Sequence, residues 1–207
     1  MRKIAILIFN DVEVLDFAGP FEVFSVTGKR GIGEAFEVFT VAETQIVNAR
    51  NRLTILPTYT FETCPFADIL LVPGGGGYHS DGAAYGSRKE MNNPLLLKWI
   101  QKRALKAELI LSVCSGAPIL AKANLLRHKK ATTHFMAIES LKEAEPTITV
   151  YPEERFVDNG NIILSAGISA GIDMALYVVK QLSGKEAAIE TAKYMQYEYF
   201  NVNYMPV

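Results

Sequence analysis

An apolar stretch that changes its periodicity at a single cysteine constrains the fold of this chain more than any other feature. Residues 109–113 are apolar and β-prone, whereas residues 117–126 carry apolar side chains at helical spacing, and Pro118 suits a first helical turn. Cys114 therefore lies between a buried strand and a helix. A joint of this kind projects its side chain above the carboxyl edge of a parallel sheet, and the small Ser115 leaves space around it.

Cys114 has two interpretations from the sequence. Unpaired amides and the macrodipole at a helix start favour a thiolate, so the position predicts a lowered pKa and a nucleophile that reacts faster than Cys64. A free cysteine is also among the most buried residue types and often packs as a small hydrophobe. A core cysteine would not need Ser-Gly after it and a proline to start the helix, so these neighbours favour the nucleophile.

Short apolar runs alternate with helical patterns along the whole chain. Strands are predicted at residues 3–9, 35–42, 53–61, 68–72, 109–113, 147–150 and 155–165, the last with an Asp-Asn-Gly-Asn hairpin signal. Helices are predicted from Pro20 to about Gly28, from Pro94 to about Leu105, and over residues 117–126, 172–182 and 185–197. Residues 131–135 are interpreted as a short strand that leads into a helix. The alternation predicts one α/β domain over residues 1–207, with a mostly parallel sheet covered by helices on both faces.

Three separated segments follow predicted strands directly, namely residues 10–16, residues 74–77 and Cys114. Because sites in open α/β sheets lie beyond the carboxyl ends of the strands, these segments are expected to converge on one crevice. Asp16 is interpreted either as a cap of the following helix or as an acid/base group. The glycine run permits positive φ and a close approach of N–H groups to a ligand, although a surface turn is the alternative. No Lys-Ser or Lys-Thr follows it, so it is not a P-loop.

Composition excludes several classes of function. The net charge of −1 gives no general attraction to nucleic acid or to anionic membranes. No run of about 18 apolar residues is present, and the first apolar run is too short for a signal peptide, so we expect a cytoplasmic protein. Two cysteines and three scattered histidines form neither a disulfide framework nor a metal-ligand spacing. His134 either faces the crevice or fills a structural role.

Five ordered blocks of sequence resemble the ThiJ/PfpI (class I glutamine amidotransferase-like) superfamily. They are LDFAGPFEVF at 15–24, LLVPGGGG at 70–77, SVCSGAPILAKANLL at 112–126, ATTHF at 131–135 and LSAGISAGIDMAL at 164–176. The first, fourth and fifth blocks resemble the branch that holds isocyanide hydratases and the amidase-like sensor domains of AraC-type regulators. Protease-like members carry histidine after the cysteine, where Ser115 stands here, so a Cys-His protease dyad is not expected.

The resemblance implies a flavodoxin-like three-layer sandwich, with Cys114 as the nucleophile on its turn and Asp16 as its acidic partner. It implies further that the chain uses no cofactor and no metal, and that it forms a homodimer whose interface the sequence does not fix. The apolar tail at 195–207 offers surface that a monomer would expose, so it is expected to pack on the body or on a partner. Backbone N–H groups of Gly74, Gly75 and Ser115 match the oxyanion donors of the family, and His134, Ile168, Phe17 and Phe135 are candidates for an apolar pocket.

Two classes of function follow from the resemblance. The first is an enzyme that adds water to a small electrophile, specifically an isocyanide hydratase that releases an N-substituted formamide. The second is a non-catalytic sensor or stress-response protein whose cysteine detects an oxidant or metabolite, and glyoxalase-, amidase- or protease-like activity is less expected. An AraC-type regulator needs a helix-turn-helix region after this domain, and none follows Val207, so recognition of DNA is not expected.

Overall fold

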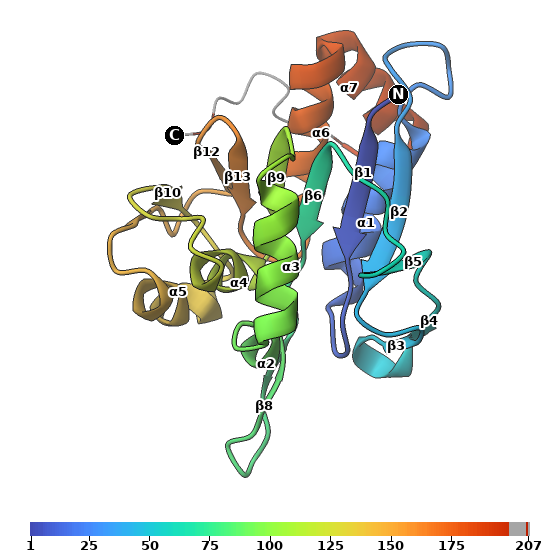
Figure 1. Cartoon of the computed structure of the whole chain (residues 1–207). Coiled ribbons are helices and arrows are strands. Elements are labelled where there is room, and N and C mark those ends of the chain that lie inside the picture. The colour runs from blue at the N-terminus through green and yellow to red at the C-terminus, as the bar shows by residue number, and fades with distance from the viewer. Residues whose placement is uncertain (199–205, 207) are drawn as a thin grey trace.

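A seven-stranded sheet runs through the part of the chain that the computed structural model describes, which is residues 1–198 and residue 206 (Figure 1). Its strands are β1 (Lys3–Leu7), β2 (Glu37–Ala42), β5 (Tyr59–Thr60), β6 (Ile69–Val72), β9 (Leu109–Ser112), β12 (Phe156–Asp158) and β13 (Ile162–Ser165). They lie in the order β12-β13-β9-β6-β1-β2-β5. All neighbouring pairs are parallel except β12 and β13, which form the predicted antiparallel hairpin.

The central strands are buried along nearly their whole length, as strands covered on both faces must be. Their register brings Ile6 of β1 level with Leu71 of β6, and Leu71 level with Leu111 of β9. The carboxyl ends of these three strands therefore meet at one edge of the sheet. The segments that follow them are the three that the sequence predicted to converge.

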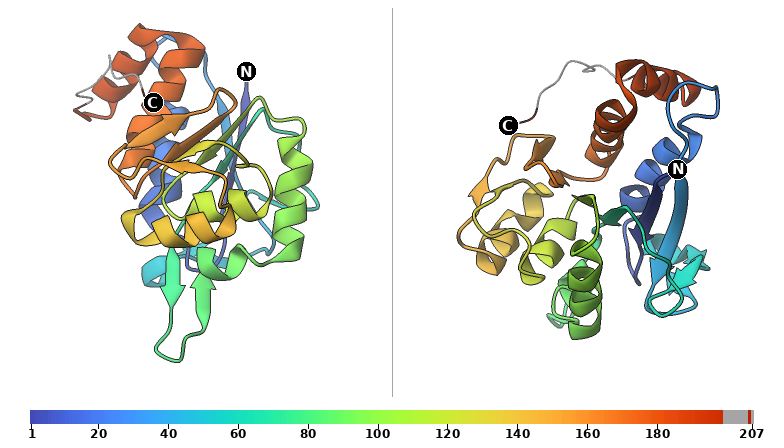
Figure 2. Two further views of the ribbon diagram at one scale, coloured as in Figure 1. Left: turned by 90° about the vertical axis from the view of Figure 1, so that its left-hand side faces the viewer. Right: turned by 45° about the horizontal axis from the view of Figure 1, so that its top comes forward.

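Helices cover both faces of the sheet (Figure 2). They are α1 (Val14–Val26), α2 (Ser87–Glu90), α3 (Pro94–Ala104), α4 (Gly116–Lys122), α5 (Ile138–Ala144), α6 (Ala170–Ser183) and α7 (Lys185–Tyr194). Helices α1, α6 and α7 pack together on one face, whereas α4 packs on β6 and β9 on the other face and contacts α2, α3 and α5. This arrangement confirms the predicted flavodoxin-like three-layer α/β sandwich.

Shorter strands and turns lie outside the main sheet. Three two-stranded ribbons are described, formed by β3 (Val47–Asn48) with β4 (Thr54–Ile55), β7 (Gly76–Tyr78) with β8 (Ala84–Gly86), and β10 (Lys130–Ala131) with β11 (Thr149–Val150). Two 3₁₀ turns, η1 (Arg50–Arg52) and η2 (Phe135–Ala137), complete them. The β7–β8 hairpin was not predicted from the glycine run that opens it, and it extends away from the body of the molecule (Figure 1).

The start of the first helix was predicted wrongly. Helix α1 begins at Val14 and contains Pro20 in its interior, so Asp16 lies in its first turn and not in the preceding connection. Tertiary packing explains the difference, because a Cβ at Gly19 would lie 2.9 Å from Ile172 on α6. The Gly-Pro pair therefore allows α1 to approach α6 closely, which offsets the helical hydrogen bond that proline removes.

Several other elements are shorter than predicted, among them α4, which ends at Lys122, and β1, which ends at Leu7. Residues 53–61 form two separate strands, β4 and β5, because Pro57 interrupts them and Leu56 is exposed. In the segment 131–135 only Ala131 belongs to a strand. Most of the apolar tail, residues 199–205 and 207, lies outside the described residues, so the predicted packing of the tail stays a prediction.

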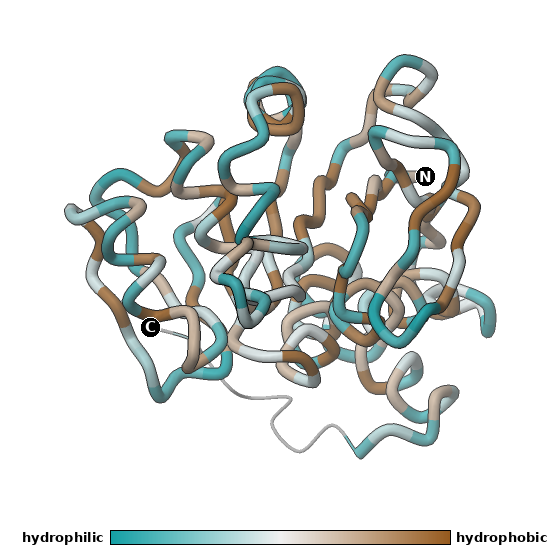
Figure 3. Tube along the Cα trace, turned by 90° about the horizontal axis from the view of Figure 1, so that it is seen from below, coloured by the Kyte–Doolittle hydropathy of each residue, from teal (hydrophilic) through white to brown (hydrophobic). Residues whose placement is uncertain are grey.

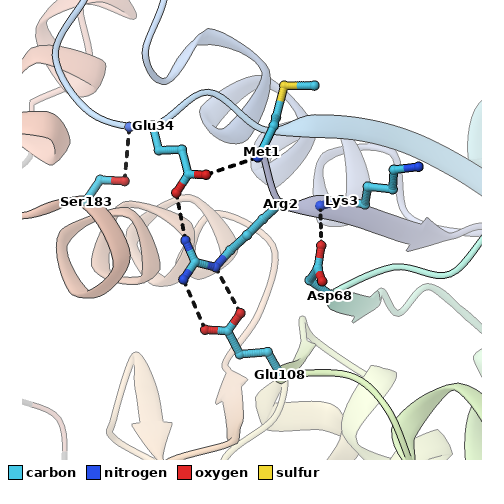
Figure 4. A network of polar contacts seen from close by, with 7 residues as sticks. All are labelled: Met1, Arg2, Lys3, Glu34, Asp68, Glu108 and Ser183. Atoms are coloured by element: carbon cyan, nitrogen blue, oxygen red, sulfur yellow. Dashed lines mark hydrogen bonds and ion pairs between the residues drawn. The ribbon is translucent and has the colours of Figure 1, made fainter.

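The amino end of the sheet is held by polar contacts (Figure 4). Arg2 donates to Glu108 and to Glu34, at 2.9 and 2.8 Å, and the backbone N–H of Lys3 donates to Asp68 over 2.7 Å. These residues lie at the end of the strands opposite to the crevice. They connect β1 to the segments before β2, β6 and β9 without contributing to the site.

Hydrophobic residues concentrate in the inner segments of the molecule and hydrophilic residues in its outer loops (Figure 3). Among the helices of residues 1–198, none has the length and apolar character needed to cross a membrane. The buried apolar side chains instead form one core cluster that includes Cys64 and Cys114.

Candidate active site

A cavity of about 580 Å³ lies at the carboxyl ends of β1, β6 and β9. Its lining residues come from six stretches of the chain that are far apart in the sequence. They are Glu13, Arg50, Gly75, Gly76, Gly77, Tyr78, Tyr85, Arg88, Cys114, Ser115, His134, Met136, Ala137, Ser140 and Ile168. The three predicted segments thus meet at one cavity.

Cys114 occupies the turn between β9 and α4 with a φ of +58°, a conformation that residues other than glycine seldom adopt. Its backbone N–H donates to the carbonyls of Ser165 and Ala166, at 3.2 and 2.9 Å. Its own carbonyl accepts from the hydroxyl of Thr133 over 2.6 Å. Contacts from two other segments therefore fix this turn, and Cys114, which is 7% exposed, lines the cavity.

Asp16 is completely buried in the first turn of α1. Its Oδ2 accepts the backbone N–H of Gly74 over 3.0 Å, which joins the helix to the loop after β6. Oδ1 is buried and has no hydrogen-bond partner among the described residues. The alternative role of Asp16 as a helix cap is wrong, because the N-cap residue is Glu13 and no side chain caps the helix.

The Asp16 carboxyl and the Cys114 thiol shift each other's pKa. Burial raises the pKa of Asp16 to about 7, against the hydrogen bonds from Gly74 and from Cys114, which lower it. Burial, together with the neighbouring charge of Asp16, raises the pKa of Cys114 to about 12. The expected low thiol pKa is therefore wrong, since desolvation outweighs the effect of the helix start. Because the two groups are coupled, they titrate as one unit.

Two backbone N–H groups, those of Ser115 and Ile168, face the sulfur and lower the pKa of Cys114 by hydrogen bonding. Ile168 reaches this position with a φ of +47°, which is strained for a β-branched residue. The structure places Ile168 in the cavity wall, as expected from the sequence. Donors in this position would stabilise negative charge that develops on the sulfur.

The glycine loop has a different role from the one predicted. The N–H of Gly74 is used by Asp16, and the N–H of Gly75 donates to the hydroxyl oxygen of Ser115 over 3.0 Å, so neither is free for an oxyanion. Ser115 is also hydrogen-bonded to Ser87 at 2.7 Å, and Ser87 donates to the carbonyl of Gly75 over 2.6 Å. Sequence reasoning missed Ser87 because no motif marks it.

Of the three ring side chains expected in the pocket, His134, Phe17 and Phe135, only His134 lines the cavity. His134 lines the cavity, and burial together with the charge of Arg88 lowers its pKa, which favours the neutral ring. Phe17 is buried in the core and Phe135 is largely exposed, and neither lines the cavity. The wall combines apolar side chains, Ile168 and Met136 among them, with charged and hydroxyl groups.

Three charged residues in the wall, Glu13, Arg50 and Arg88, were not predicted. Glu13 and Arg50 form an ion pair at 3.3 Å. Arg50 belongs to η1 and Arg88 to α2, two short elements without a strong periodic pattern. The sequence gives no local signal that places them at the cavity. Within residues 1–198 and 206, no group of three histidine, cysteine or acidic side chains is arranged to hold a metal ion.

Comparison with known proteins agrees with the fold. A model of the DJ-1/PfpI family matches residues 2–181, and the chain belongs to this family. It is 34% identical over 188 residues to isonitrile hydratase of Pseudomonas putida, covering 90% of this chain and 74% of that protein. A crystal structure of a ThiJ/PfpI family protein from Pseudomonas syringae superposes with a TM-score of 0.82 at 30% identity, over 95% of this chain and 75% of that one. Drosophila melanogaster DJ-1beta superposes with a TM-score of 0.78 at 20% identity, over 96% of this chain and 99% of that one, which shows the fold alone.

Proposed function

We propose that this chain is a cysteine-dependent hydratase that needs no cofactor and converts isonitriles, also called isocyanides, into N-substituted formamides. One observation carries the proposal, namely the buried Asp16 carboxyl, with a pKa of about 7, coupled to the Cys114 thiol beside a cavity. The similarity to isonitrile hydratase supports this choice of substrate. We propose that the protein acts in the cytoplasm on a small molecule, as a homodimer.

The coupled pair explains how a thiol with a high pKa acts as a nucleophile. Between pH values of about 7 and about 12 the pair holds one proton, which either Cys114 or Asp16 can carry. Transfer of this proton to the carboxyl leaves a thiolate, and the N–H groups of Ser115 and Ile168 stabilise it. The nucleophile is thus formed at the moment of attack.

The reaction proceeds in two stages. Cys114 Sγ forms a bond to the isonitrile carbon, and Asp16 transfers its proton to the same carbon, which gives a thioimidate. Asp16, now a carboxylate, accepts a proton from a water molecule as the water oxygen adds to that carbon. Asp16 passes this proton to the imidate nitrogen, which gives a tetrahedral adduct on Cys114. The hydroxyl proton of the adduct then moves to Asp16 as the C–S bond breaks, so the N-substituted formamide leaves and the pair again holds one proton.

Formamide production tests the proposal directly. The protein is incubated with cyclohexyl isocyanide and with an aryl isocyanide, and the formamide is followed by absorbance and identified by mass spectrometry. Wild type is expected to produce it, Cys114→Ala is expected to produce none, and Cys64→Ala serves as the matched thiol control. Absence of formamide with the wild type, or equal activity of Cys114→Ala, would rule out the hydratase.

A further inference from the structure

One positive charge in the cavity wall is not balanced. Of the three charged side chains that line the cavity, Glu13 and Arg50 pair with each other. Arg88 forms no ion pair with any residue that the structure describes. Its Nη1 is buried and has no hydrogen-bond acceptor within that same part of the chain. A buried guanidinium nitrogen without an acceptor is costly, so the site gains stability when an acceptor enters the cavity.

The position of Arg88 relates this charge to the reactive sulfur. Arg88 lies on α2, which packs against α4, the helix that begins directly after Cys114. Its charge acts on the ring of His134, and Glu13 acts on the same ring with opposite sign. Arg88, His134 and Glu13 therefore line the same cavity as Cys114.

We propose that Arg88 is a specificity-determining residue that binds a carboxylate on the substrate. The preferred electrophile would then be a small isonitrile with an acidic substituent, and neutral alkyl or aryl isonitriles would be poorer substrates. A guanidinium binds a carboxylate through charge-assisted hydrogen bonds, which are about twice as strong as neutral ones. The identity of the reacting group rests on the proposed function, whereas the anion site rests on Arg88 and the cavity alone.

A first experiment detects the anion site without any turnover. The alkylation rate of Cys114 is measured by peptide mass spectrometry with iodoacetate and with iodoacetamide, which differ in a carboxylate against a neutral amide. The rate with iodoacetate divided by the rate with iodoacetamide reports the charge around the thiol, because a positive charge speeds the reaction of the anionic reagent only. Arg88→Gln is expected to lower the ratio about tenfold, as loss of one charge-assisted hydrogen bond predicts. Arg88→Lys retains the positive charge and is therefore expected to keep most of the wild-type rate ratio.

The neighbouring cation provides the matched control. Lys89 is exposed and does not line the cavity, so Lys89→Gln removes the same charge one position along the chain and is expected to leave the ratio unchanged. An equal ratio in wild type and Arg88→Gln, or an equal fall in Lys89→Gln, would overturn the anion site. A Cys114 that reacts with neither reagent would also overturn it, because the cavity would then not give access to the thiol.

A second experiment tests the substrate class. The values of kcat/KM are compared for isocyanoacetate and for its methyl ester, in wild type, Arg88→Gln and Lys89→Gln. Wild type is expected to prefer the acid, and Arg88→Gln is expected to lose that preference by about tenfold or more. If the ester is preferred by wild type, the substrate class is wrong although the hydratase stands. If neither compound is hydrated while the alkylation ratio still depends on Arg88, the hydratase is wrong and the anion site stands.

Discussion

The backbone N–H of Gly74 donates to Oδ2 of Asp16 over 3.0 Å and leaves Oδ1 of the same carboxyl without a partner. One oxygen is therefore fixed by the loop after β6, and the other is available to carry a proton. Because this side chain is fully buried beside Cys114, its protonation state governs both the proposed chemistry and the pH dependence of stability.

Asp16→Asn is expected to lower kcat/KM for isonitrile hydration by about two orders of magnitude or more, because the amide cannot transfer the proton. The wild-type rate is expected to rise with pH through about 7, where the coupled pair loses its first proton and becomes active. A pH series from 5 to 9 measures this rise. A flat wild-type profile, or an Asp16→Asn variant with full activity, would contradict the proton-transfer role.

The raised pKa of Asp16 also predicts that stability falls as pH rises. The folded protein retains this proton up to a pH of about 7, whereas the unfolded chain releases it near the ordinary aspartate pKa of 3.8. The stabilisation that this proton gives is therefore complete below pH 3.8 and lost as the pH rises through about 7. Relative to Asp16→Asn, the free energy of unfolding of wild type is expected to fall by on the order of 3 kcal/mol between pH 4 and pH 8. Urea unfolding of both proteins across this range measures the difference. Parallel curves would show that the pKa is not raised.

Gly75→Ala is expected to destabilise the protein by about 3 kcal/mol or more. Gly75 has a φ of +118°, and a Cβ there would lie 2.3 Å from the backbone nitrogen of Glu13. Gly82, at the tip of the β7–β8 hairpin, also has a positive φ, but a Cβ at that position meets nothing within 4 Å. Gly82→Ala is therefore the matched control, with an expected cost of about 1 kcal/mol. Equal thermal unfolding of the two variants would show that contact with Glu13 is unimportant.

The homodimer remains a prediction that the mass in solution tests. Light scattering at micromolar concentration is expected to give twice the chain mass of 22.9 kDa. A variant truncated after Glu198 tests whether the apolar tail contributes to the interface. A monomeric mass for the full chain would remove the dimer from the proposed function.

Those parts of the fold that depend on local pattern could be predicted from the sequence. The buried strands around Ile6, Leu71 and Leu111 are apolar on both faces, and α3 begins at Pro94 as expected. The Asn93 side chain caps this helix by accepting from two backbone N–H groups. The position of Cys114 between β9 and α4 follows from the same local signals.

The remaining features depend on tertiary contacts that no local pattern reports. Pro20 suggested a helix start, yet the close packing of Gly19 against Ile172 keeps it inside α1. The pKa of Cys114 was predicted in the wrong direction, because the helix start is visible in the sequence and burial is not. Arg88 reaches the cavity only because the β7–β8 hairpin returns the chain to it.

The two outer strands of the sheet have a consequence for association. Strand β5 has two residues and β12 has three, so these borders present few unpaired backbone groups as a template for another chain. Edge-to-edge pairing, which leads to sheet extension and fibrillar aggregation, is thereby disfavoured along the described borders. A homodimer of this protein is accordingly expected to form through helices or loops, with the two sheets remaining separate.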